Sequence, residues 1–97
     1  MLTMALSLAA TLFPYNYSVS GQGSLSCATA FSDQNEPYTE QWIGGFISGV
    51  NSTRGGRVGL TTDLAGLMAE TKIFCEREPS KTLTWATQQA YVKLLSS

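Results

Sequence analysis

The chain has 97 residues, of which six are Lys or Arg, seven are Asp or Glu, and none is His. A formal net charge of −1 gives no basic surface for nucleic acid or an anionic membrane. Without histidine there is no His-ligated metal site, imidazole general base or imidazole pH switch. A chain of this length makes one small domain at most.

The N-terminal part has no side-chain charge before Asp33, and residues 2–13 form an apolar run. This run is too short for a bilayer, which needs about 20 apolar residues, but it suits the hydrophobic region of a secretory signal peptide. No Lys or Arg precedes it, which departs from that pattern. The alternative is a hydrophobic N-terminal helix, which Pro14 disfavours.

Small residues around Ser20 and Gly21 suit cleavage at that point. We therefore predict a signal peptide at residues 1–20 and a single helical domain at residues 21–97, exported to the periplasm or secreted. With the signal removed, we expect no association with a membrane.

Two cysteines, Cys27 and Cys75, lie in the predicted mature part. A small exported domain has a modest core, and an even number of cysteines in it indicates a disulfide. In the chain-entropy model a bridge between these positions stabilises the fold by roughly 4 kcal/mol. A lipid anchor on Cys27 is the alternative, although Ser24 to Ser26 make a poor lipidation motif. We expect no metal or cofactor.

Four helices are expected in the mature part. Ser24 or Ser26 should cap a short helix around Cys27. Thr39 should cap a second helix that ends at Asn51, before the glycine-rich loop at residues 51–59.

The second of these helices has the most apolar face. At about 100° per residue, its large apolar side chains fall within an arc of about 140°. They are Trp42, Ile43, Phe46, Ile47 and Val50. Gly45 and Gly49 flank this arc, and we predict that they let the helix carrying Cys75 approach closely.

Two further helices follow the loop. Thr61 or Thr62 should cap the third, which ends before Pro79, and Ser80 should cap the fourth. The core face of the third comprises Leu64, Leu67, Met68, Thr71, Phe74 and Cys75, and that of the fourth comprises Leu83, Ala86, Thr87, Ala90, Tyr91 and Leu94. The fold class is therefore all-α: three main helices and a short N-terminal one, clipped by one disulfide.

Three large apolar residues lie outside these core faces: Ile73, Trp85 and Val92. They form either an exposed apolar patch for a partner or a second copy of the chain, or the second side of a last helix that is buried on two sides.

The sequence has few residues suited to catalysis, because the carboxylates are scattered and no base is present to activate a serine. We expect no catalytic residue and a protein that is not an enzyme. The loop glycines beside Arg54 and Arg57 lack the strand and the Lys-Ser/Thr pair of a phosphate-binding loop. Asn51-Ser52-Thr53 matches the N-glycosylation pattern.

One order of motifs resembles the HdeA/HdeB group of small exported helical proteins from Gram-negative bacteria. It runs from Cys27 through Trp-x-x-Gly-Phe-x-x-Gly and a glycine-rich loop to Phe-Cys-x-x-x-Pro and a final amphipathic helix. The resemblance covers roughly residues 26–94 and implies a periplasmic chaperone that binds unfolding clients in acid. Protonating all seven carboxylates would shift the formal side-chain charge from −1 to +6, and repulsion would then uncover the face from Trp42 to Val50. The chain is poorer in Lys and Asp than that group.

A shorter run, Gly45-Phe-Ile-Ser-Gly-Val followed by a helix and Pro79, resembles periplasmic immunity proteins of type VI secretion systems. That resemblance implies direct neutralisation of a toxin. The expected partner is therefore a protein: an unfolded client, a toxin or a second copy of the chain.

Overall fold

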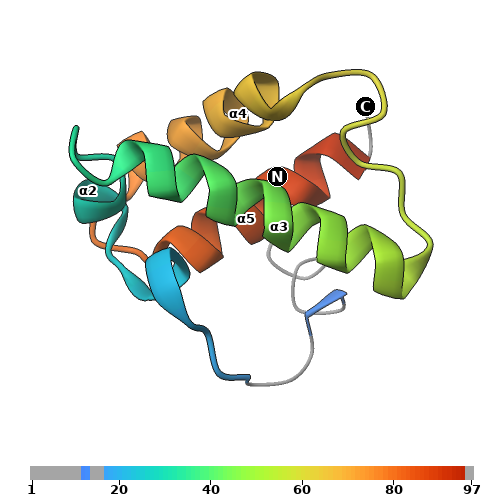
Figure 1. The fold of residues 1–97 in the computed structure, drawn as a ribbon, viewed down its shortest axis with the longest axis horizontal. Helices are drawn as coiled ribbons and strands as arrows, with labels where there is room; N and C mark the ends of the chain where they lie inside the picture. The colour runs from blue at the N-terminus through green and yellow to red at the C-terminus, as the bar shows by residue number, and fades with distance from the viewer. Residues whose placement is uncertain (1–11, 14–16, 96–97) are drawn as a thin grey trace.

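The computed structural model describes residues 12–13 and 17–95. The helical elements are η1 (Gly21–Ser24), α2 (Cys27–Ala30), α3 (Glu36–Arg54), α4 (Leu64–Arg77) and α5 (Leu83–Leu95) (Figure 1). Within the described residues the only β-pairing is an isolated bridge between Ser26 and Thr82. The predicted all-α class, with three main helices and a short N-terminal one, is confirmed.

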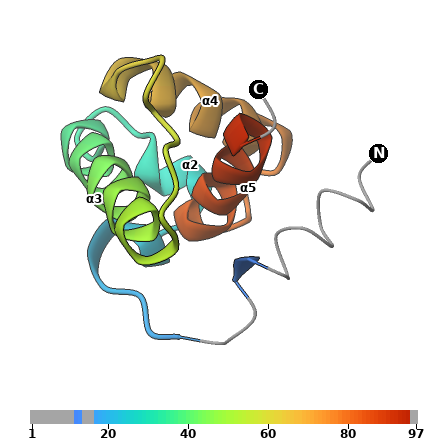
Figure 2. The ribbon, with the colours of Figure 1, turned by 90° about the vertical axis from the view of Figure 1, so that its right-hand side faces the viewer.

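The three long helices surround one core of buried side chains. Figure 2 looks roughly along α3 and shows α4 and α5 beside it. The contact between α4 and α5 is the most extensive, and α3 packs against both. The predicted core faces supply most of the buried side chains. The largest that are fully buried include Ile43, Ile47, Thr71, Leu83, Thr87 and Tyr91.

The predicted disulfide is present, and it links α2 to α4 through Cys27 and Cys75. Backbone hydrogen bonds join the same region to the start of α5: Cys27 N–H donates to the Lys81 carbonyl (2.7 Å), and Leu83 N–H donates to the Leu25 carbonyl (2.9 Å). The segment before α2 is thus fixed to the corner between α4 and α5.

Some helices begin at other residues than predicted, and one residue predicted as a cap makes a tertiary contact instead. Ser26 caps α2 as expected, with its side chain accepting from Thr29 N–H. However, α3 begins at Glu36, and Thr39 lies inside it, where its hydroxyl donates to the Ala30 carbonyl at 2.6 Å. The predicted cap at Thr39 was wrong because Pro37, in the first turn, starts the helix earlier.

The later helices show similar shifts. α3 continues past Asn51 and ends at Arg54. Gly55 caps it with a φ of 69°, a backbone conformation that suits a glycine. Asp63, rather than Thr61 or Thr62, caps α4 by accepting from Gly66 N–H. Thr82, rather than Ser80, accepts from Trp85 N–H at the start of α5.

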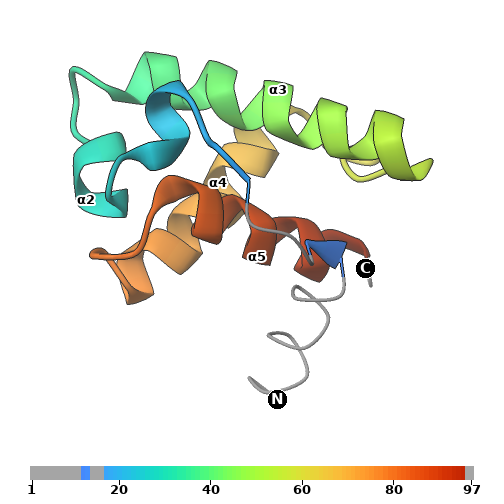
Figure 3. The ribbon, with the colours of Figure 1, turned by 90° about the horizontal axis from the view of Figure 1, so that it is seen from below.

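Most of the predicted signal peptide, residues 1–11 and 14–16, lies outside the described residues. Figure 3 views the molecule from below, with η1 and the residues just before it beside α3 and α5. η1 contacts both α3 and α5. The N-terminal part of the chain therefore covers the side of the bundle that faces away from α4.

Candidate functional site: the outer side of α3

The predicted apolar face of α3 divides into two sides. Ile43 and Ile47 are 0% and 2% exposed and lie in the core. Trp42, Phe46 and Val50 are only half-buried and pack at the edge of that core. We call this second group the outer side of α3.

An aromatic row runs along this outer side. The rings of Trp42 and Phe46 stack with centroids 5.1 Å apart, and Phe13 stacks on Phe46 at 5.9 Å. The Trp42 indole N–H donates to the Ser20 carbonyl at 3.1 Å. Gly23 of η1 lies directly against the indole, because a Cβ there would come within 2.1 Å of Trp42 Cζ2. The outer side is therefore covered by residues that precede α2.

Phe13 sits between three groups. Besides stacking on Phe46, its ring meets the Tyr91 ring edge-on at 6.3 Å, and the Arg54 guanidinium lies 5.9 Å from its centroid. Beside it is an open, mainly apolar groove of about 520 Å³. We call this the α3 groove; its lining includes Phe13, Gly45, Phe46, Gly49, Val50 and Arg54.

The predicted role of Gly45 and Gly49 as contacts for the helix carrying Cys75 was wrong. Both are exposed, and a Cβ added to either would meet nothing within 4 Å. The close approach occurs instead at Gly44, where a Cβ would lie 3.1 Å from Leu64 Cδ1. Because successive positions turn by about 100°, Gly44 faces α4 while Gly45 and Gly49 border the groove.

The residues predicted as a partner patch do not form one. Val92 is only 5% exposed. Trp85 is half-buried and packs edge-on against Phe74, with the Lys81 ammonium 5.6 Å from its ring. Of the three, only Ile73 is exposed. The alternative, a last helix buried on two sides, is confirmed for α5.

Ile73 instead borders a second groove, of about 580 Å³, between the loop before α4, one face of α4 and the C-terminal end of α5. Leu60 and Leu95 also line it, and Leu60 is 69% exposed.

A polar clamp that the sequence reading missed holds the loop after α3. The Asn51 side chain donates to the Val58 carbonyl (2.8 Å) and accepts from Val58 N–H (3.2 Å) and from the Tyr91 hydroxyl (2.8 Å). The only sequence signal for it is an asparagine before a glycine-rich loop, and that signal predicts a helix end. Burial raises the pKa of Tyr91, and the nearby Arg54 partly opposes this.

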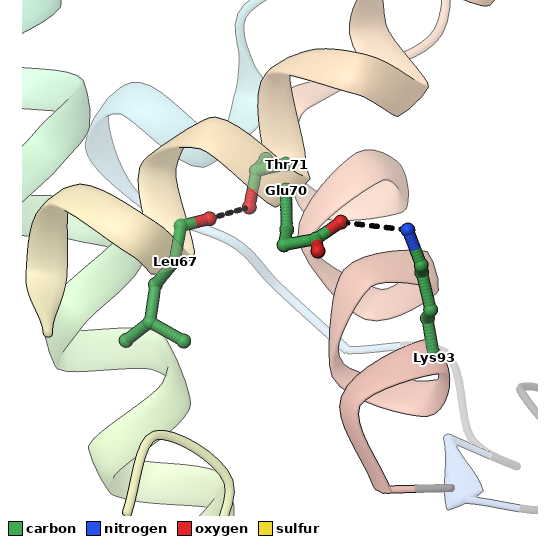
Figure 4. Close-up of polar contacts among 4 residues, drawn as sticks. All are labelled: Leu67, Glu70, Thr71 and Lys93. Carbon is green, nitrogen blue, oxygen red and sulfur yellow. Dashed lines mark hydrogen bonds and ion pairs between the residues drawn. The ribbon is translucent and has the colours of Figure 1, made fainter. Parts of the chain in front are cut away.

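An ion pair links α4 to α5 on the surface. Lys93 Nζ lies 2.8 Å from Glu70 Oε1. Beside it on α4, the buried Thr71 hydroxyl donates to the Leu67 carbonyl at 2.9 Å (Figure 4). Since the Lys93 side chain is half exposed, the pair is worth no more than about 1 kcal/mol.

Among the described residues no three or more His, Cys, Asp or Glu side chains are grouped as a metal site would need. None of the described helices has the length and apolar character to cross a membrane. Comparison with family models, curated proteins and solved structures gives no match.

Proposed function

We propose that the protein is exported and binds unfolded polypeptides through the outer side of α3, in the manner that the resemblance to the HdeA/HdeB group implies. It acts by binding and not by catalysis. The observation that carries the proposal is that the outer side of α3 is covered by chain that precedes α2 and not by another long helix. After the predicted cleavage the cover that remains is η1, whose Gly23 lies against the Trp42 indole.

The disulfide supports this because it divides the chain into a closed loop and two free ends. The loop from Cys27 to Cys75 contains α3, whereas η1 and α5 lie outside it. The cover of the outer side can therefore move away while α2, α3 and α4 remain linked. Aromatic side chains bury about 150–250 Å² each, so an uncovered outer side presents a large apolar surface to a client.

Acid is the proposed trigger. Protonating the seven carboxylates leaves six Lys and Arg charges unopposed, and their repulsion favours a less compact state. It also removes the charge of Glu70 that pairs with Lys93 across α4 and α5 (Figure 4). Salt screens such repulsion, with a Debye length of about 10 Å at 0.1 M, so added salt should reduce the acid opening.

A titration from about pH 7 to about pH 2 with an apolar dye, alongside an aggregation assay with an acid-sensitive client, tests the proposal. Dye binding and client protection should rise together as the pH falls. Phe46→Ser should weaken both, whereas Tyr38→Ala, on the same helix but 64% exposed, should not. A protein that stays closed in acid and protects no client would contradict the proposal.

Export is tested separately. Mass spectrometry of the form released from the cell should show a chain starting near Gly21, whose mass increases by two hydrogens on reduction. Release of the full-length chain would contradict the signal-peptide prediction without bearing on client binding.

Neutralisation of a secreted toxin is the second candidate. It is favoured by the second groove, where Leu60 and Ile73 are exposed in the folded protein without any acid opening. This candidate predicts a tight complex at neutral pH with a toxin encoded beside the gene, weakened by Leu60→Asp. A toxin that binds equally well to that variant would contradict the use of this groove.

A further inference from the structure

We propose that the α3 groove, together with the adjoining place now taken by the Phe13 ring, is a subsite for a phenylalanine-bearing polypeptide segment, and that the chain's own Phe13 holds that place until the leader is removed. The inference rests on the proposed function, because it names the ligand class and the regulation of the same surface.

The surroundings of Phe13 are those of an aromatic-ring subsite. Phe46 stacks on one face at 5.9 Å, Tyr91 meets the ring edge-on at 6.3 Å, and the Arg54 guanidinium lies 5.9 Å from the centroid. Stacked, edge-on and cation–π contacts each select an aromatic ring over an aliphatic chain. These contacts identify the class of side chain accepted beside Phe46 as aromatic, and the chain's own phenylalanine is the example that the structure shows.

The chain's own segment does not fill the groove. About 520 Å³ of open space remains beside Phe13, which is within the range of about 300–1,000 Å³ for ligand sites. Gly45 and Gly49 leave one wall of it without side chains, since an added Cβ would meet nothing there. A polypeptide backbone can therefore lie against α3 at these two positions while a phenylalanine occupies the place of Phe13.

The predicted cleavage point lies between Phe13 and η1, the two parts of the chain that cover the outer side of α3. A cut near Ser20 or Gly21 removes Phe13, together with Tyr17, whose hydroxyl is hydrogen-bonded to the Gln88 side-chain amide. It leaves Gly23 of η1 against Trp42. Until that cut, the tethered Phe13 competes with any free peptide at an effective concentration in the millimolar range. The uncleaved protein is thus self-blocked, and cleavage opens the groove without dismantling the remainder of the fold.

The test uses the full chain at neutral pH and a labelled peptide with the sequence of residues 12–17, Leu-Phe-Pro-Tyr-Asn-Tyr. Phe13→Ala in the protein should increase the affinity for this peptide by about tenfold or more, because the place of the Phe13 ring is then vacant and the peptide has no internal competitor. Tyr38→Ala, which removes an exposed aromatic ring away from the groove, should bind as weakly as the unaltered chain. A peptide with alanine in place of its phenylalanine should not bind to Phe13→Ala.

A second variant locates the binding. In the Phe13→Ala background, Gly49→Leu places a side chain in open space in the groove and should reduce peptide affinity by about tenfold or more. Ser48→Leu, at the adjacent exposed position outside the groove lining, should leave it unchanged. Circular dichroism and thermal unfolding verify that each variant is folded.

Equal peptide binding by the unaltered chain and folded Phe13→Ala would overturn the proposal, as would binding that survives Gly49→Leu. Because the assay uses neither acid nor a client protein, it is independent of the chaperone test. Peptide binding without client protection in acid would reject the chaperone function and support the subsite.

Discussion

Replacing Gly45 and Gly49 by alanine should stabilise the protein. Both glycines lie in the interior of α3, are exposed, and have no positive φ that would need a glycine. An added methyl group meets no neighbour within 4 Å at either position. Because glycine is about 0.8–1.0 kcal/mol less favourable than alanine inside a helix, the double variant should gain about 2 kcal/mol.

For a domain of this size, about 1 kcal/mol raises Tm by roughly 4–8 °C, so thermal unfolding resolves each single variant. Gly44→Ala is the matched control: its methyl group would lie 3.1 Å from Leu64 Cδ1, and crowding should cancel part or all of the same gain. A lower Tm for Gly49→Ala would refute the reasoning, because it would show that this position is packed in the free protein. The conclusion that the α3 groove is open would then also be wrong.

The remaining predictions concern the links between helices. Reducing the disulfide, which joins residues 48 apart, should lower the free energy of unfolding by about 4 kcal/mol, measured by urea denaturation with and without reductant; an unchanged midpoint would contradict it. Asn51→Ala leaves both Val58 backbone groups and the Tyr91 hydroxyl without their partner and should cost about 2–3 kcal/mol, whereas Thr53→Ala, whose exposed hydroxyl bonds within α3, should change stability little; equal effects would argue against the clamp. Burial raises the pKa of Tyr91 above its usual value of 10.0, so at high pH the unfolded chain loses this proton before the folded protein does. Its contribution to stability is therefore constant below pH 10.0 and falls as the pH rises through the folded pKa; alkaline denaturation of Tyr91→Phe should show a shallower fall, and an identical slope would contradict this.

Helical periodicity identified the core correctly where a side chain packs against another long helix. Ile43 and Ile47 are buried, as are Thr71 on α4 and Thr87 on α5, and all four belong to predicted core faces. This works because a regular helix repeats its core contacts every three or four residues. The pairing of the two cysteines followed from their number and the size of the domain.

Periodicity failed where irregular chain supplies the contact. Trp42 packs against Gly23 and Phe13 lies on Phe46, and no repeat along α3 encodes such partners. The division of the α3 face into a core side and an outer side therefore could not be predicted. The same holds for the burial of Val92, which depends on how the bundle closes around α5, and for Thr82, which caps α5 from within a bridge to Ser26.

The two sides of α3 also differ in what it takes to expose them. Reaching Ile43 and Ile47 requires separating α3 from α4 and α5, and the disulfide holds α4 close through α2. Reaching Trp42 and its aromatic neighbours requires only that chain outside the disulfide loop moves. In the full chain this breaks the Trp42–Ser20, Thr84–Gly23 and Gln88–Tyr17 hydrogen bonds and a few ring contacts, and of these hydrogen bonds only Thr84–Gly23 remains after the predicted cleavage. Local openings of this kind have lower free energies than global unfolding. A partner that binds through α3 should therefore meet its outer side first, and protection of the Trp42 indole from solvent quenchers is the signal by which such binding is recognised.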